Sequence, residues 1–147
     1  MNVNLKRLDT SLPLPKFESK GACGFDFLAR EERTVAPKQI ELIPANTIIE
    51  VPEGHMLMIA PRSSTPRKTG LCFPHSIGII DQDFCGEEDE IQIQVMNFTD
   101  KPVTIKKGDR IAQGLFVKIE KAEWTEVTEI TAKTRGMFGS TGGHSND

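Results

Sequence analysis

The stretch Ile91-Gln92-Ile93-Gln94-Val95 decides the fold class, because apolar and amide side chains alternate strictly along it. Successive side chains of a β-strand point to opposite faces, so this stretch predicts a strand with one buried face and one polar face. Short apolar or β-branched runs recur on both sides of it, separated by turn sequences. These runs predict further strands over residues 39–43, 47–51, 56–60, 102–106, 110–117 and 124–130. Such spacing is typical of an all-β sandwich or barrel.

Length and composition predict one soluble globular domain. The chain has 147 residues, of which 37% are hydrophobic and 27% charged, and its net charge is −3. This balance, with basic residues scattered along the chain, argues against sequence-independent nucleic-acid binding. No apolar run approaches the roughly 18 residues of a membrane span, and no signal-peptide core follows Met1. Cys23, Cys72 and Cys85 lack zinc-site spacing, so we expect free thiols and an intracellular location.

The tail differs in composition from the rest of the chain. Residues 133–147 contain four glycines with serine, threonine and a single phenylalanine, and such a segment cannot form core. One interpretation is a disordered terminus. The other is a mobile flap whose glycines let backbone N–H groups wrap around a phosphate.

Polar residues that could carry chemistry stand among turn glycines. Asp26 interrupts an apolar strand, where an acid is more often an outward-facing residue than a functional one. Arg62-Ser63-Ser64 lies at an expected strand-to-helix junction and offers a phosphate cradle. A short helix is expected after Ser63, because Thr65 is a capping residue type and Pro66 suits a first turn.

Two further segments carry such residues. Asp81 ends an apolar run three residues before Phe84, where a carboxylate suits a general base, a grip on a sugar hydroxyl, or simply a loop cap. The stretch Gly108-Asp109-Arg110-Ile111-Ala112-Gln113-Gly114, taken alone, is a turn entering a strand. Each of these segments is ambiguous by itself.

In combination and order, the segments resemble the five motifs of the homotrimeric dUTPase family. Asp26 falls in the first motif, and Arg62-Ser63-Ser64 in the second. The third comprises Gly78-Ile79-Ile80-Asp81 with Phe84 and Gly86. Arg110-Ile111-Ala112-Gln113 matches the fourth, and Phe138-Gly139-Ser140-Thr141-Gly142 the fifth. The resemblance spans roughly residues 20–142.

The resemblance implies a distorted jelly-roll β domain over residues 1–132 and a mobile arm over residues 133–147 that closes an active site. It implies a homotrimer in which each site draws residues from several subunits. The implied reaction is hydrolysis of dUTP to dUMP and pyrophosphate, which limits uracil incorporation into DNA and supplies dUMP for dTMP synthesis. Neither nucleic acid nor a membrane is an expected partner.

The resemblance also implies roles for single residues. A uracil pocket that works largely through backbone groups would be formed by Ile77, Gly78, Ile79 and Ile80, with His75 at its rim. Asp81 would hold the 3′-hydroxyl and help activate the water that attacks the α-phosphorus. Gln113 would help to position that water or neighbouring phosphate oxygens.

Phosphate and metal contacts follow in the same way. Implied phosphate contacts come from Arg62, Ser63 and Ser64 in the second motif, and from Gly139, Ser140 and Thr141 in the arm. Phe138 would stack on the uracil. Mg²⁺ would be held mainly by the three phosphates and water, with Asp26 in contact through water.

Three departures from the family pattern stand out. Phe84 replaces the usual Tyr, so the ring that packs on the deoxyribose remains without its hydroxyl. The segment 87–90 is longer and more acidic than usual, with an expected effect on the rim of the site or on an interface. The fifth motif is compressed, so the γ-phosphate cation is either Arg135, which we favour for its planar guanidinium, or Lys133.

Two other functions are compatible with parts of the pattern. A dCTP deaminase shares the fold and an Arg-Ser-Ser motif, but it needs a catalytic Glu and lacks the Gly-Ser-Thr-Gly ending found at residues 139–142. A non-catalytic, dUTPase-like nucleotide-binding regulator is the other alternative. The presence of Asp81, Gln113 and the tail argues against inactivity.

Overall fold

The computed structural model describes residues 1–136 and shows an all-β body, as predicted. Its strands are β1 (Leu5–Arg7), β2 (Phe25–Leu28), β3 (Arg33–Val35), β4 (Ile40–Pro44), β5 (Thr47–Ile49), β6 (His55–Ala60), β7 (Leu71–Cys72), β8 (Gly78–Ile80), β9 (Gln92–Asn97), β10 (Val103–Ile105) and β11 (Arg110–Lys118). One short helix, α1 (Thr65–Thr69), occurs within the described residues. None of their helices is long and apolar enough to cross a membrane.

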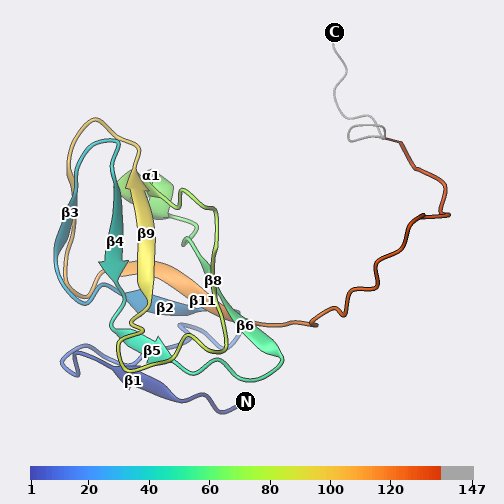
Figure 1. The fold of residues 1–147 in the computed structure, drawn as a ribbon. Coiled ribbons are helices and arrows are strands. Elements are labelled where there is room, and N and C mark those ends of the chain that lie inside the picture. Colours follow the sequence, from blue (N-terminus) through green and yellow to red (C-terminus); the bar gives the residue numbers. More distant parts are fainter. Residues whose placement is uncertain (137–147) are drawn as a thin grey trace, which may run out of the picture.

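Two antiparallel sheets form the main layers of the body (Figure 1). The larger has the strand order β2-β11-β6-β8, and the smaller has the order β4-β9-β7. Two-stranded pairs, β1 with β5 and β10 with β3, complete the body. Because strands distant in sequence lie next to each other, residues of widely separated motifs are brought onto common strands.

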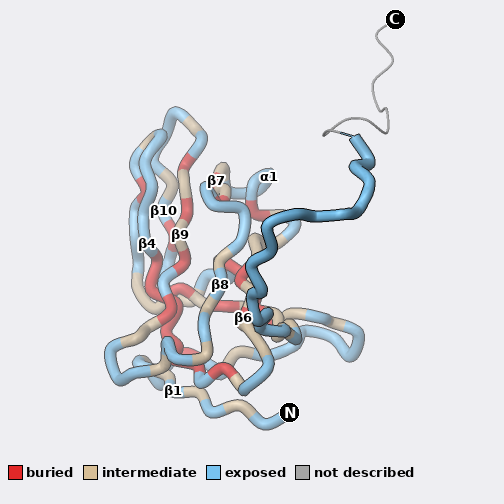
Figure 2. Tube along the Cα trace, turned by 45° about the vertical axis from the view of Figure 1, so that its right-hand side comes forward, coloured by how far each residue is buried: buried red, intermediate tan, exposed pale blue. Residues whose placement is uncertain are grey.

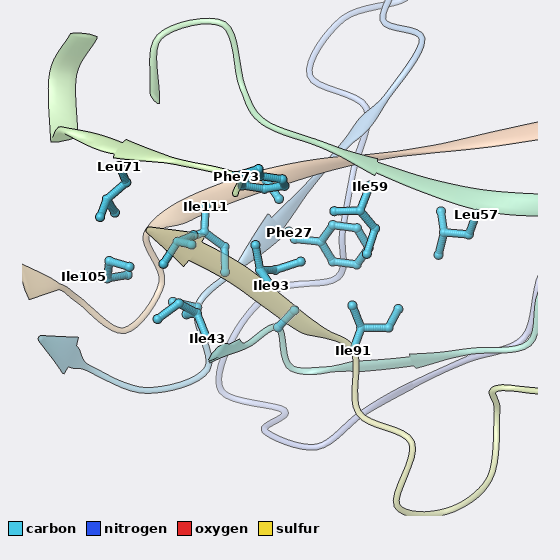
Figure 3. Packing of buried hydrophobic residues seen from close by; sticks show 14 of the residues in the cluster. Phe27, Ile43, Leu57, Ile59, Leu71, Phe73, Ile91, Ile93, Ile105 and Ile111 are labelled. Atoms are coloured by element: carbon cyan, nitrogen blue, oxygen red, sulfur yellow. The ribbon is translucent and has the colours of Figure 1, made fainter. Parts of the chain in front are cut away.

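The core lies between these sheets and follows the period-two pattern. Buried residues run through the centre of the body, while the outer segments are exposed (Figure 2). Phe27 and Leu57 of the larger sheet are fully buried, as are Ile43 and Ile93 of the smaller one, and they converge between the layers (Figure 3). Each such side chain stabilises the fold by about 1.5–3 kcal/mol relative to exposure.

The predicted strands in the body are confirmed to within a residue or two, and so are their turns. Asn46 adopts a left-handed φ of 63° between β4 and β5, a conformation that asparagine tolerates. Gly108 has a φ of 85° in the turn that leads into β11. Helix α1 is confirmed, with Ser64 rather than Thr65 at the N-cap, and Gly70 ends it with a left-handed φ of 74°.

The strand predicted over residues 124–130 is wrong. No strand follows β11 among the described residues, and the last backbone hydrogen bond to the body joins Ile119 N–H to the Gly54 carbonyl at 2.9 Å. From there the chain leads away from the body (Figure 1). Trp124, Val127 and Ile130 are 93%, 55% and 76% exposed, so their apolar pattern has no partner surface among residues 1–136.

Candidate active site

One group of the expected site residues meets on the larger sheet. Asp26 lies on β2, Gln113 lies on β11, and Arg62 follows the end of β6. Because β11 is hydrogen-bonded to both neighbours, Gln113 stands opposite Asp26 on one side and Ala60 on the other. The sheet thus brings three separate motifs of the sequence to one place.

Charges in this group are paired closely. The Asp26 carboxylate accepts from Arg62 Nε at 2.8 Å and from Arg110 Nη1 at 3.3 Å, so both of its oxygens are engaged. Its side chain is only 13% exposed, and a partly buried carboxylate of this kind requires such partners. Gln113 Nε2 donates to the Pro61 carbonyl at 3.0 Å, which orients its amide beside the arginine. Glu18 also lies 3.5 Å from Arg110, but it is 39% exposed. The guanidinium N–H groups that Asp26 leaves unused suit phosphate oxygens, and we call this pair of arginines the cationic corner.

Arg110 was absent from the expected site residues, and a β-bulge explains why. The pairing of β11 with β2 shifts register between Arg110 and Ala112. A strict period of two would put Arg110 and Gln113 on opposite faces, but the shift brings both to the side of Asp26. As a consequence, Ile111 and Ala112 are both buried. The two adjacent apolar residues in this motif are the sequence signal for the bulge.

Helix α1 positions the two serines of the second motif. Ser63 is exposed directly after Arg62, and Ser64 is the N-cap residue, although its side chain makes no capping hydrogen bond. Both residues lie next to the cationic corner. Their hydroxyls are not used to cap the helix, so they are free to contact a ligand.

The other group of expected residues lies at the edge strand β8. β8 pairs only with β6, so its outer edge carries main-chain N–H and C=O groups that no neighbouring strand of the described chain covers. Ile77 and Ile79 are 41% and 55% exposed beside this edge. His75 stacks on Phe73, with ring centroids 6.0 Å apart, and its ring lies near the edge. An uncovered strand edge can pair with a planar amide-like ligand.

Asp81 and Phe84 continue from this edge into an irregular loop. Both are exposed, and the Phe84 N–H turns back to the Asp81 carbonyl at 3.3 Å. Asp81 borders a cavity of about 340 Å³ that is also lined by His55, Met56, Gln82, Asp83, Ile119 and Lys121. The base of the tail, at Ile119 and Lys121, thus shares a cavity with the expected catalytic carboxylate.

One chain does not bring the two groups together. Gln113 stands opposite Ala60 on β6, whereas Ile80 stands opposite Leu57 on the other side of the same strand. Asp81 is therefore displaced from Gln113 by about 13 Å along β6 and by two strand spacings, about 10 Å, across the sheet. Side chains cannot span that separation, so the expected site residues of one chain form two separate groups, which we call the two half-sites.

Comparison with known proteins identifies the family. A family model described as dUTPase matches residues 10–142 of the chain. The chain is 36% identical over 148 residues to the deoxyuridine 5'-triphosphate nucleotidohydrolase of Thermobifida fusca. The matched region covers 98% of this chain and 80% of that protein. The chain belongs to the dUTPase family. Hydrolysis of dUTP to dUMP and pyrophosphate is the function of this family.

Solved dUTPase structures confirm the jelly-roll fold. The crystal structure of the Streptococcus mutans dUTPase superposes with a TM-score of 0.75 at 31% identity, covering 82% of this chain and 98% of that one. The dUTPase of Staphylococcus bacteriophage 80alpha, a G164S mutant with dUpNHpp, shares the fold with a TM-score of 0.83 at 23% identity and covers 96% and 98% of the two chains.

Part of the expected arm lies outside the described residues. This applies to Phe138, Gly139, Ser140 and Thr141. Lys133 and Arg135, the alternative phosphate cations, are both exposed in the described part of the tail.

Proposed function

We propose that this dUTPase cleaves dUTP by attack of water on the α-phosphorus, and that the two half-sites described above bind different parts of the nucleotide. The observation that supports the proposal is their contrasting chemistry. One half-site is a corner with two arginines, and the other is an uncovered strand edge that ends in a carboxylate. A nucleoside triphosphate needs both kinds of surface, one for its base and one for its phosphates.

The strand edge suits the base. Uracil presents two acceptors and one N–H donor, and the alternating N–H and C=O groups beside Ile77, Gly78, Ile79 and Ile80 match such an edge. Cytosine has an acceptor at N3 and a donor at its 4-amino group, where uracil has the reverse, so it would leave main-chain groups unpaired. Phe84 supplies a flat surface for the deoxyribose, and His75 closes the rim.

The cationic corner suits the triphosphate. Arg62 donates bidentately to phosphate oxygens, with Ser63 and Ser64 beside it, and Gln113 orients the attacking water. Asp81 accepts a proton from that water as its oxygen bonds to phosphorus, while the bond to the bridging oxygen of pyrophosphate breaks. From the arm, Phe138 covers the base. Arg135, Gly139, Ser140 and Thr141 bind the γ-phosphate and exclude bulk water.

Magnesium fits this site as an ion that the phosphates of the substrate bind. Residues 1–136 contain no group of three or more His, Cys, Asp or Glu side chains that could form a protein cage for the ion. Both oxygens of Asp26 are already engaged by arginines, so contact through water suits it better than direct ligation. Mg²⁺ would neutralise phosphate charge when bound with dUTP, as it prefers phosphate oxygens and water.

A homotrimer completes the site. Asp81 and Gln113 lie too far apart within one chain, so a second copy must bring its cationic corner to the first chain's strand edge. The outer face of the smaller sheet is a suitable contact, because Ile40 and Leu42 are 49% and 53% exposed there. Gln94 and Met96 stand opposite them on β9. This uncharged face can meet its own copies about a symmetry axis without repulsion.

An assay tests the proposed reaction. The protein is incubated with Mg²⁺ and either dUTP or dCTP, and pyrophosphate and ammonia are both measured. We expect pyrophosphate from dUTP alone. Release of ammonia would instead support the deaminase alternative, which membership of the dUTPase family disfavours. Nucleotide binding without either product would support the non-catalytic regulator.

A further inference from the structure

The loop between β8 and β9 carries Asp81 and Phe84 but has little burial to hold it. Every residue from 81 to 90 is exposed or only partly buried. At its beginning, Gln82 Nε2 donates to the His55 carbonyl at 2.9 Å. Ile91, which ends the loop just before β9, is fully buried, and its N–H donates to the Thr47 carbonyl at 2.9 Å. Residues 81–90 have no such apolar anchor of their own, so they depend on polar contacts for their position.

At the other end of this loop stands Glu90, the last residue of the unusual acidic segment. Its carboxylate receives two parallel hydrogen bonds from Arg30, from Nε at 2.8 Å and from Nη2 at 3.0 Å. The Asn46 backbone N–H donates to the same carboxylate at 2.9 Å. The Glu90 side chain is 11% exposed, so this bidentate pair is shielded from solvent and stronger than a surface pair.

The partners of Glu90 are held rigidly. Arg30 lies two residues beyond the end of β2, and its own N–H donates to the Pro44 carbonyl at 2.8 Å. Asn46 is buried, and its side-chain amide exchanges hydrogen bonds with the backbone of Asp9 at 2.6 and 3.0 Å. Glu90 also raises the pKa of the Arg30 guanidinium above its ordinary value, so the arginine stays charged at any working pH.

The other acidic residues of the segment do not reach the body in this way. Asp89 accepts the Gly86 N–H at 2.7 Å and so only closes a local turn. Glu87 pairs with Lys6, but its side chain is 84% exposed. The Glu88 carboxylate has no hydrogen-bond or ion-pair partner within residues 1–136.

We propose that Glu90 is a positioning residue for nucleotide binding: its pair with Arg30 and its bond to Asn46 fix where the loop returns to the body, and so where Asp81 and Phe84 stand. This inference rests on the proposed function of that loop. Without the anchor, the loop occupies its binding position only part of the time. Apparent affinity falls in proportion to that fraction, whereas turnover of bound substrate changes less.

Steady-state kinetics of Glu90→Gln test the proposal, with Glu88→Gln as the matched control. Glutamine keeps the shape and the bond from Asn46, but it cannot accept two hydrogen bonds from Arg30. If the competent loop position is occupied about one-tenth of the time, we expect KM for dUTP to rise about tenfold, with kcat within about twofold. Amide hydrogen exchange over residues 81–90 should accelerate. Glu88→Gln should match the wild type in both respects.

A second variant separates positioning from general stability. Arg30→Gln should reproduce the rise in KM, and the double variant should show no further rise, because both changes remove one interaction. If Glu90→Gln lowers only the melting temperature and leaves KM and loop exchange unchanged at 20 °C, the role is purely structural and the inference is wrong. An inactive wild type would instead contradict the proposed function itself.

Discussion

Asp26 gains its significance from the two arginines that share its carboxylate. Taken alone in the sequence, it had the pattern of an ordinary outward-facing strand residue, and only the pairing of β2 with β11 reveals the cluster. Replacing it with asparagine removes the charge that holds Arg62 and Arg110 in place. Hydrogen bonds to charged groups contribute about 1.5–3 kcal/mol, so we expect kcat/KM of Asp26→Asn to fall about 10- to 100-fold.

A neighbouring acid is the control for that change. Glu18 lies 3.5 Å from Arg110 and is 39% exposed, so Glu18→Gln should alter kcat/KM by less than about threefold. Wild-type kinetics for Asp26→Asn would mean that Arg62 is oriented without it.

Two phenylalanine rings pack so closely against Gly114 that no side chain fits there. An added Cβ would lie 2.7 Å from Phe25 Cζ and 2.7 Å from Phe27 Cε2, and these rings are part of the core. We expect Gly114→Ala to lower the free energy of unfolding by about 1–3 kcal/mol, as overpacking does. In Gly21→Ala, where nothing lies within 4 Å, the change should stay within about 0.5 kcal/mol. Equal urea midpoints for both variants would contradict this account of the rings.

Asp9 makes the stability of the fold depend on pH. Its hydrogen bond from Lys107, at 2.5 Å, and its bonds from Ser11 lower its pKa below the ordinary value. A depressed folded-state pKa stabilises the protein above the unfolded pKa of about 3.9, and the effect is lost as the pH falls toward the folded value. The stability difference between wild type and Asp9→Asn should therefore be larger at about pH 7 than at about pH 3. A difference that urea unfolding finds independent of pH would refute this role.

Among the secondary-structure elements, strands could be predicted where the alternation of apolar and polar residues coincides with the alternation of buried and exposed side chains. Ile93 and Val95 are buried while Gln92 is exposed, so β9 follows its sequence pattern directly. The bulge in β11 was not predicted, because a shift of register arises between two strands. Glu90 and Arg30 escaped prediction for the same reason, since their contact joins residues that are 60 positions apart.

The failed strand at residues 124–130 has a different cause. A strand needs a neighbour for its hydrogen bonds, and the described part of the tail beyond Ile119 makes none to the body. The apolar residues Trp124, Val127 and Ile130 therefore mark a segment suited to another surface, such as that of a second subunit.

The tail should matter for turnover more than for folding. Because the described residues beyond Ile119 make no hydrogen bond to the body, deletion of residues 134–147 should leave the free energy of unfolding within about 0.5 kcal/mol of wild type. Loss of arm closure should reduce kcat about 100-fold or more. Stopped-flow or steady-state assays measure this, and unchanged turnover would show that the arm is dispensable.

For the whole molecule, the motifs could be recognised from sequence, but their division into two half-sites could not. That division follows from strand order, because β6 separates β8 from β11 and offsets Asp81 from Gln113 along its length. The central claim is therefore that a working site combines Asp81 of one chain with Gln113 of another.

Complementation between inactive variants tests this claim most directly. Asp81→Asn and Gln113→Ala are each purified, shown to be inactive and correctly assembled, and then unfolded and refolded together in equal amounts. After random assembly, each site has an even chance of receiving an intact Asp81 and, independently, an even chance of receiving an intact Gln113. We therefore expect the mixture to recover about a quarter of wild-type dUTP hydrolysis. Refolded mixtures with no more activity than the separate variants would contradict the account, because both residues would then have to act within one chain.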